Sequence, residues 1–361
     1  MMTKQNPSIF AKIYKKALNL TLTSLDKVLP VAVIVLGAFF FLNDKITSGA
    51  FNRYYATIMV MIAVAIIMAA SLNIATGFLG QLVLGHAGFM ALGAYSAAIF
   101  AKAMYASITN PLLLFVLSAL VALVIAGFAG FLVGTPALRL RGDYLGIMTL
   151  GFGEIVKVVL TNLEITNGAQ GLTGIPRIMS FPIAYFTMVF VVGMIALFMN
   201  SRHGRAMISI REDEIAAESV GIHITKYKIM GFVMAAGLGG VGGAIYAFQV
   251  GFLAPKVFDF VKSIDIFVVV VLGGMGSLSG SIVAAIVLTF VPEVLREFED
   301  YRLLIYSGLL IFTMLFRPQG LMGTKEFRLT ITDFRFGVQK IINWVKGKRR
   351  GPKGGTSDVN S

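Results

Sequence analysis

The chain has 361 residues, of which 57% are hydrophobic and only 14% charged, so polar side chains are too scarce to cover an ordinary soluble surface. Its formal net charge is +13, but residues 1–27 and 317–361 alone hold 15 basic and 4 acidic side chains, whereas the middle is nearly neutral. Basic ends on an apolar body favour contact with anionic lipid and argue against nucleic acid as a partner. The sequence therefore predicts an integral membrane protein.

Long apolar stretches set the predicted architecture, because a helix needs about 20 such residues to cross the hydrocarbon. About ten candidate spans lie near residues 28–43, 54–72, 88–104, 111–133, 143–162, 182–199, 229–250, 263–275, 279–296 and 303–317. We expect an all-α polytopic bundle with three parts along the chain. These are a basic N-terminal arm over 1–27, with an interfacial helix at 8–20, a transmembrane domain over 28–317, and a basic tail over 318–361.

Residues 73–87 (NIATGFLGQLVLGHA) are apolar but interrupted by glycine, which predicts a broken or re-entrant segment that faces protein. Gln81 and His86 in this segment are candidates for a translocation path, because unwound backbone and neutral polar groups can bind a zwitterion or an amide. For His86 alone, a hydrogen bond between helices is the more common role. Glu154 is counted as the clear mid-span carboxylate, and Lys157, three residues on, can neutralise it.

Glycines spaced four apart predict places where helix backbones approach closely in lipid. The pairs are Gly130 and Gly134, Gly239 and Gly243, and Gly276 and Gly280. Residues 237–242 also match G-x-G-x-x-G, but no βαβ unit surrounds them, so helix packing is the better interpretation.

Residues 201–228 form the long charged loop between apolar spans. Charges of both signs followed by Gly221 predict a short helix with a glycine stop. The loop is either simply solvated or a docking helix for a soluble partner. Since Lys and Arg resist translocation, this loop and both basic termini are predicted to be cytoplasmic.

Enzyme chemistry finds no support in the residue types. The chain has no cysteine, its three histidines lie too far apart in sequence for a helical metal pair, and it has no G-x-x-x-x-G-K-[ST] phosphate loop. No Ser/His/Asp, paired-Asp or H-E-x-x-H constellation lies in the spans. We expect no enzyme activity, no cofactor and no metal, and any ATP that drives this protein would be bound by another chain.

Six ordered blocks over roughly residues 54–323 resemble the permease subunits of bacterial branched-chain amino acid ABC importers, LivM type. They are GFLGQLVLGHAGFMALGAYSAA (77–98), LRLRGDYLGIMTLGFGEIVKVV (138–159), NGAQGLTGIP (167–176), GRAMISIREDEIAAESVGIHITKYK (204–228), VVLGGMGSLSGSIVAA (270–285) and FRPQGLMG (316–323). The arm and the tail after residue 323 fall outside these blocks.

The resemblance implies a subunit that translocates leucine, isoleucine or valine across the bacterial cytoplasmic membrane. Its implied partners are a second, LivH-like permease subunit, two cytoplasmic ATP-binding subunits and an extracytoplasmic amino-acid-binding protein. Permeases for urea and short amides share much of the pattern. An ion-coupled secondary transporter is a more distant alternative, because its spans would be expected to carry unpaired carboxylates or sodium sites.

The resemblance also implies roles for particular residues. Residues 201–228 resemble the coupling helix that rests on the ATPase subunit, with Glu214, Ala216, Ala217 and Gly221 in an E-x-A-A-x-x-x-G pattern. The charged neighbours included with them are Arg205, Arg211, Glu212 and Asp213. The segment around Gln81, His86 and Gly88, together with Glu154, is expected near the permeation path.

Overall fold

The computed structural model describes residues 35–46, 53–137 and 142–297, and within 307–323 only residues 307–308, 311, 315–316 and 320–323. Residues 35–46 are helical and overlap the predicted span 28–43. The predicted interfacial helix at 8–20, the C-terminal tail and most of the predicted span 303–317 lie outside the described residues.

Helices dominate the described part of the chain, where the β structure consists of one isolated bridge between Leu172 and Leu253. Six helical segments there are long and apolar enough to cross a membrane. They are α2 (Arg53–Asn73) with its continuation η1 (Ile74–Phe78), α3 (His86–Met104), α4 (Pro111–Ala137), α5 (Asp143–Asn162), α6 (Phe181–Met199) and α9 (Ile224–Val250). The chain is therefore an all-helical, multi-pass membrane protein.

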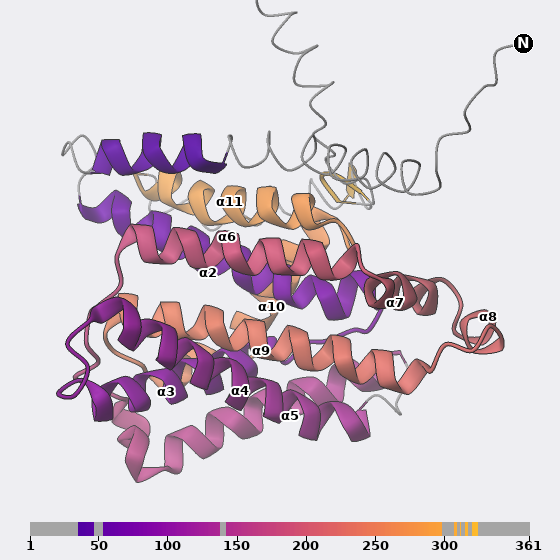
Figure 1. Ribbon diagram of the computed structural model, residues 1–361, viewed down its shortest axis with the longest axis horizontal. Coiled ribbons are helices and arrows are strands. Elements are labelled where there is room, and N and C mark those ends of the chain that lie inside the picture. Colours follow the sequence, from indigo (N-terminus) through magenta and orange to yellow (C-terminus); the bar gives the residue numbers. More distant parts are fainter. Residues whose placement is uncertain are drawn as a thin grey trace, which may run out of the picture. The chain divides into compact units, whose positions relative to one another are not determined.

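Shorter elements complete the bundle. α10 (Phe260–Gly273) and α11 (Leu278–Val294) follow the short 3₁₀ turn η4 (Pro255–Phe258), and η5 (Leu295–Glu297) follows α11. α7 (Arg202–Glu212) and α8 (Glu214–Ser219) connect α6 to α9 and lie together at one end of the bundle (Figure 1). The connection between α5 and α6 carries the 3₁₀ turns η2 (Glu164–Thr166) and η3 (Gly168–Gln170).

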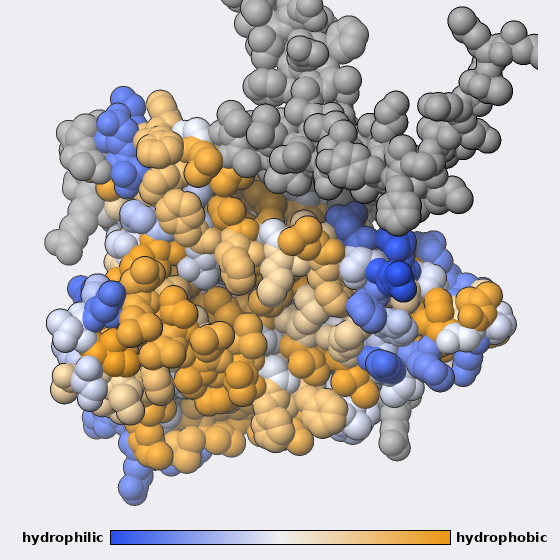
Figure 2. Space-filling model, in the orientation of Figure 1, coloured by the Kyte–Doolittle hydropathy of each residue, from blue (hydrophilic) through white to orange (hydrophobic). Residues whose placement is uncertain are grey.

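The surface of the bundle is divided by polarity. Figure 2 shows a broad hydrophobic area over the middle of the helices and hydrophilic side chains at both ends, including the end that carries α7 and α8. Large exposed apolar side chains such as Val124, Phe128 and Phe190 contribute to the surfaces of α4 and α6. An apolar belt between two polar ends is the pattern expected of helices surrounded by lipid.

Helix α9 lies at the centre of the packing, against α2, α3 and α4. A Cβ added to Gly93 of α3 would lie 2.2 Å from the carbonyl oxygen of Gly240, and one added to Gly243 would lie 2.1 Å from that of Met90. A Cβ on Gly130 of α4 would approach the Cβ of Ala236 to 2.5 Å. The predicted packing role of the glycines in α4 and α9 is thus confirmed, because an added Cβ would collide with atoms of a neighbouring helix.

The third predicted glycine pair differs from this pattern. Gly280 lies in α11 against Gly273, but Gly276 lies outside any helix, in the turn between α10 and α11, at φ +85°. A residue with a Cβ is strained in this left-handed region, so Gly276 serves a sharp turn rather than helix packing.

Candidate functional site

The end of the bundle that carries α7 and α8 brings together most of the residues selected from the sequence. Ser201 caps α7 by accepting hydrogen bonds from His203 N and Gly204 N, at 3.2 and 3.4 Å. Asp213 caps α8 through its Oδ1, which accepts from Ile215 N and Ala216 N at 2.9 and 3.0 Å. Each cap satisfies backbone donors that a helix start leaves open, so the two helices are defined by local sequence.

The loop after α8 ends as the sequence predicts. Gly221 has φ +86°, its N–H donates to Glu218 O at 2.9 Å, and the next N–H, of Ile222, donates to Ala217 O at 3.1 Å. This is a glycine-based helix stop, and it confirms the predicted end of the short helix.

Helix α8 presents apolar side chains in a polar setting. Ile215 and Val220 are 82% and 76% exposed, and Figure 2 shows hydrophobic side chains over the α8 tip next to the hydrophilic surface of α7. Ala217, in contrast, is buried. Exposed apolar groups on a projecting helix suit contact with another protein better than contact with water.

An ion pair joins α8 to the start of α9. Lys228 is only 5% exposed, and its ammonium group donates to Glu214 Oε1. A buried ammonium needs a counter-charge because desolvation is costly. Glu214, selected as part of the E-x-A-A pattern, therefore neutralises a charge at the base of the bundle.

Arg211 connects α7 to the interrupted segment after α2. Its Nη1 donates to Gly77 O in η1 at 2.9 Å, while Nη2 and Nε donate to Glu212 Oε1 at 2.5 and 3.2 Å. Arg205, six residues earlier, bonds only locally among the described residues, to Asn200 O at 2.7 Å. Of these two predicted loop arginines, Arg211 is the one that reaches the membrane helices.

The segment that receives Arg211 is irregular. η1 is a π-helix, the residues from Gly80 to Gly85 are not helical, and α3 begins at His86. Thr76 Oγ1 is buried in η1 and has no hydrogen-bond partner within the described residues. A buried polar atom without a partner costs about 1–3 kcal/mol, so neighbouring elements must hold η1 in place. Single π-helical turns inside α-helices are frequent at functional sites.

Asn73 ties this segment to the turn between α10 and α11. Its Oδ1 accepts from Gly276 N at 2.9 Å, and its Nδ2 donates to Ser277 O at 3.0 Å and Ser281 Oγ at 2.9 Å. A Cβ on Gly77 would overlap both Asn73 Oδ1 and Gly276 N, at 1.7 and 2.2 Å. The interrupted segment, the α10–α11 turn and α7 therefore meet at one polar junction, defined here as Asn73, Gly77, Arg211 and Gly276.

Gln81 lines a cavity of about 400 Å³ beside this junction. Gln81 is 8% exposed and its side-chain amide makes no hydrogen bond within the described part of the chain. The same cavity is lined by Asp213, Glu214 and Lys228. The sequence assigned Gln81 to the path and the carboxylates to coupling, but the structure places both groups around one space.

His86 lies inside the bundle and not on this cavity. It is fully buried, its Nε2 lies 2.9 Å from Ser71 Oγ, and a Cβ on Gly239 would approach that nitrogen to 2.8 Å. Gly88 packs against α5, since its Cβ would lie 2.8 Å from the Cα of Gly153. Both residues therefore contact neighbouring helices directly.

Glu154 forms an ion pair with Lys157, one turn further along α5. Its Oε1 also accepts from Phe260 N, at 3.1 Å, at the start of α10. The carboxylate thus has two partners.

Three residues were missed by the sequence interpretation. Asn73 and Lys228 stand at the ends of apolar spans, where polar side chains are ordinary, and only their long-range partners mark them. Asp265 is a second carboxylate within the predicted span 263–275, so counting Glu154 as the clear case was incomplete. The signal for Asp265 was present, because a carboxylate in an apolar run needs an explanation.

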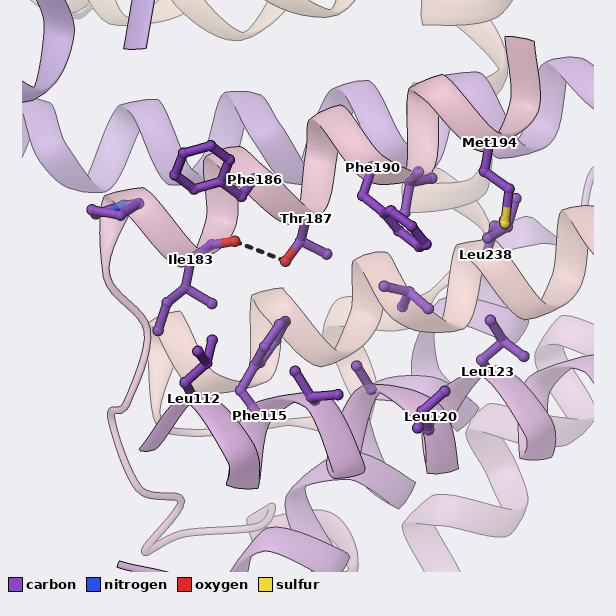
Figure 3. Close-up of a pocket in the computed structure, with 15 residues that line it drawn as sticks. Leu112, Phe115, Leu120, Leu123, Ile183, Phe186, Thr187, Phe190, Met194 and Leu238 are labelled. Atoms are coloured by element: carbon purple, nitrogen blue, oxygen red, sulfur yellow. Dashed lines mark hydrogen bonds between the residues drawn. The ribbon is translucent and has the colours of Figure 1, made fainter. Parts of the chain in front are cut away.

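A groove between α4, α6 and α9 has a volume of about 560 Å³ (Figure 3). Its lining is too apolar to bind a polar transported molecule. Leu112, Phe115, Phe186 and Phe190 are among its apolar lining residues. Its polar side chain, Thr187, donates to Ile183 O of its own helix at 2.7 Å. The groove therefore suits hydrocarbon.

Within the described residues, no three His, Asp or Glu side chains are grouped to hold a metal ion.

Comparison with known proteins gives a consistent result. The family model described as "Branched-chain amino acid transport system / permease component" matches residues 54–315. The chain is 36% identical over 306 residues to the high-affinity branched-chain amino acid transport system permease protein LivM of Salmonella typhimurium, covering 75% of this chain and 70% of that protein. The LivM protein of Escherichia coli is 36% identical over 317 residues, with 78% and 73% covered.

A more distant relative is the permease protein LivH of Escherichia coli, 24% identical over 283 residues, with 72% of this chain and 91% of that protein covered. No solved structure matches. The resemblance identified from the six sequence blocks is confirmed, and the chain belongs to the family of permease components of branched-chain amino acid transport systems.

Proposed function

We propose that this chain is one of two permease subunits of an ATP-driven importer that carries leucine, isoleucine and valine into the bacterial cytoplasm. The family membership and the LivM and LivH relatives support the transport class and the pairing with a second, related permease. Two ATP-binding subunits and an extracytoplasmic binding protein complete the proposed assembly. ATP hydrolysis belongs to the ATP-binding subunits, and this chain performs no chemistry of its own.

The proposed topology has about ten spans within residues 28–317, the glycine-rich segment 73–87 being re-entrant. Both termini and the loop 201–228 are cytoplasmic in this proposal, and the parts 1–27 and 318–361 contact the inner face of the cytoplasmic membrane. Supporting observations are the basic ends of the sequence and the polar α7–α8 end of the bundle.

The observation that carries the coupling role is the bond from Arg211 to Gly77 O. Ile215 and Val220 on α8 would contact the ATP-binding subunit, and a displacement of α7 would move Arg211 with it. Through Gly77 and Asn73, that displacement would reach both η1 and the turn between α10 and α11. Small shifts at a docking surface can thereby switch packed helices between two arrangements.

We propose that Gln81 faces cargo at the cytoplasmic mouth, because its amide is open to the cavity and free of protein partners in the described residues. His86, Gly88 and Glu154 are assigned to the helix contacts around the path.

Uptake of labelled leucine by the reconstituted five-subunit system tests the function. We expect uptake that requires ATP inside, a loaded binding protein outside and no ion gradient. Uptake that survives ATP depletion with an intact ion gradient would identify a secondary transporter. ATP-dependent uptake of urea or a short amide, with none of leucine, would identify the other alternative and overturn the substrate assignment.

A further inference from the structure

A second cavity, of about 830 Å³, opens between α2, α10 and α11, with Met90 of α3 and Tyr246 of α9 at its edge. Its wall is largely apolar and includes Met61, Val64, Met68, Ile266, Val269 and Leu288. Unlike the groove in Figure 3, it also contains two charged side chains, Lys262 and Asp265 of α10.

The two charges are unpaired within the described part of the chain. Lys262 and Asp265 are three residues apart on α10 and interact electrostatically, but they form no direct ion pair with one another or with any other described residue. The Lys262 backbone N–H bonds to Asp259 Oδ1 at 3.0 Å, but neither the Lys262 ammonium nor the Asp265 carboxylate has a hydrogen-bond partner among those residues. An ammonium and a carboxylate therefore line the same largely apolar cavity without a hydrogen bond to another described residue.

These charges lie at the depth of the membrane helices. Phe260 N bonds to Glu154, near the middle of α5, and Ser263 Oγ accepts from Ala87 N, in the first turn of α3, at 3.1 Å. The start of α10 therefore lies alongside α3 and α5, although Phe260, Val261 and Asp265 are exposed at the surface of the bundle. Ionisable side chains at such a depth are expensive unless they are paired, hydrated or used for function.

We propose that this cavity holds an aliphatic amino acid during its passage through the membrane. Asp265 would bind the α-ammonium group of the cargo and Lys262 its α-carboxylate, while the aliphatic side chain lies against Met68, Ile266 and Leu288. The inference rests on the proposed function and names the substrate contacts of that function.

The arrangement selects a zwitterion with an apolar side chain over other solutes. A cation or an anion would satisfy one of the two charges and leave the other unpaired, and urea carries neither charge. Polar side chains would gain nothing from the apolar wall. The cavity is also larger than one such amino acid, so the hold is loose, as suits a carrier whose cargo has been selected earlier by a binding protein.

Cysteine protection tests the site independently of transport, because the chain has no cysteine of its own. Thr289 lines the cavity, so Thr289→Cys in the assembled transporter can be labelled with a small thiol reagent in proteoliposomes. We expect L-leucine to slow the labelling. The leucine analogues that lack one charged group, 4-methylpentanoate and 3-methylbutylamine, should need about ten-fold higher concentrations, since each loses a charge-assisted contact.

Variants assign the two charges. Asp265→Asn and Lys262→Met, each added to Thr289→Cys, should each raise the leucine concentration for half-protection about ten-fold or more. Labelling without leucine should keep the rate of the Thr289→Cys parent, which reports an intact fold. Lys256→Met and Glu164→Gln are matched controls, because both side chains are exposed and neither lines the cavity. They should leave protection unchanged.

Two results would overturn the proposal. One is leucine protection that both cavity variants leave unaltered, and the other is labelling insensitive to leucine, which would show a crevice filled by lipid. Leucine uptake measured in the same proteoliposomes separates this inference from the proposed function. Uptake without protection would refute the site alone, whereas ATP-driven uptake of a different solute in place of leucine would refute the function.

Discussion

The guanidinium of Arg211 donates a hydrogen bond to the carbonyl oxygen of Gly77, 134 residues earlier in the chain. One partner belongs to a charged loop and the other to a π-helical turn in an apolar segment. The bond is a direct contact between the predicted docking element and the membrane helices. A movement of α7 should therefore be transmitted to η1.

Arg211→Ala should reduce leucine uptake about ten-fold or more while basal ATPase activity of the assembled transporter remains, because a charge-assisted bond between loop and helix is lost. Stimulation of the ATPase by the loaded binding protein should disappear. Arg205→Ala is the matched control, since it removes the same charge from α7 but only a local bond to Asn200. Equal effects of the two substitutions would contradict a specific role for Arg211.

Gly221 adopts φ +86°, and nothing lies within 4 Å of a Cβ added there. Gly221→Val should therefore act through backbone strain alone, at a cost of about 1–2 kcal/mol. We expect normal membrane insertion but impaired uptake and impaired ATPase stimulation. Gly193→Val has equal space and no positive φ, so it should behave as wild type in the same uptake assay. Wild-type uptake by Gly221→Val would remove this loop from the coupling pathway.

The pair of Lys228 and Glu214 should matter more when one partner is lost than when both are. Glu214→Gln leaves a buried ammonium without its counter-charge, and because the Glu214 side chain is 35% exposed, solvent screening limits the expected loss to roughly 1–3 kcal/mol. Adding Lys228→Met should restore much of this stability. Thermal denaturation of the purified protein in detergent measures the effect, and additive losses in the double variant would show that the two charges are not coupled.

His86 offers a test of interior polarity. His86→Gln keeps a neutral group able to bond to Ser71, whereas His86→Lys introduces an ammonium into a fully buried position beneath Gly239. We expect the Gln variant to reach the membrane in near-normal amounts and to transport, and the Lys variant to accumulate poorly. Quantitative immunoblotting of membranes followed by leucine uptake distinguishes them. Equal accumulation of the two variants would argue that water reaches this position.

The proposed topology can be mapped with single cysteines. Ser219→Cys on α8 should be labelled by an impermeant reagent only after the cytoplasmic face is exposed, and Lys256→Cys in η4 should be labelled in intact, right-side-out cells. Both residues are exposed, so a failure to label reflects sidedness rather than burial. Labelling of Ser219→Cys in intact cells would show that the orientation is opposite to the one proposed.

The sequence best predicts helices and the contacts between residues that are close together in the chain. The lengths of the apolar runs predicted the six long helices α2 to α6 and α9, with shifts at their ends. Gly221 and the spacing of Glu154 and Lys157 predicted contacts between near neighbours. Asn73 could not be interpreted in that way, because its three bonds lead to residues 276–281 and depend on how distant helices pack. In the sequence, Lys228 does not differ from the other basic residues of the loop 201–228, because its burial depends on how the chain folds.

The glycine contacts of α9 also limit how this protein can move. Where Gly240 meets Gly93 backbone to backbone, no long side chain can swing aside to absorb sliding. α3, α4 and α9 should then behave as a single rigid strut during the transport cycle, with spin-label distances between them constant from resting to ATP-bound states. Movement would then be concentrated in the segments that connect these three helices to the rest of the chain. A small molecule bound at those segments would stop the transport cycle without contacting the transported amino acid.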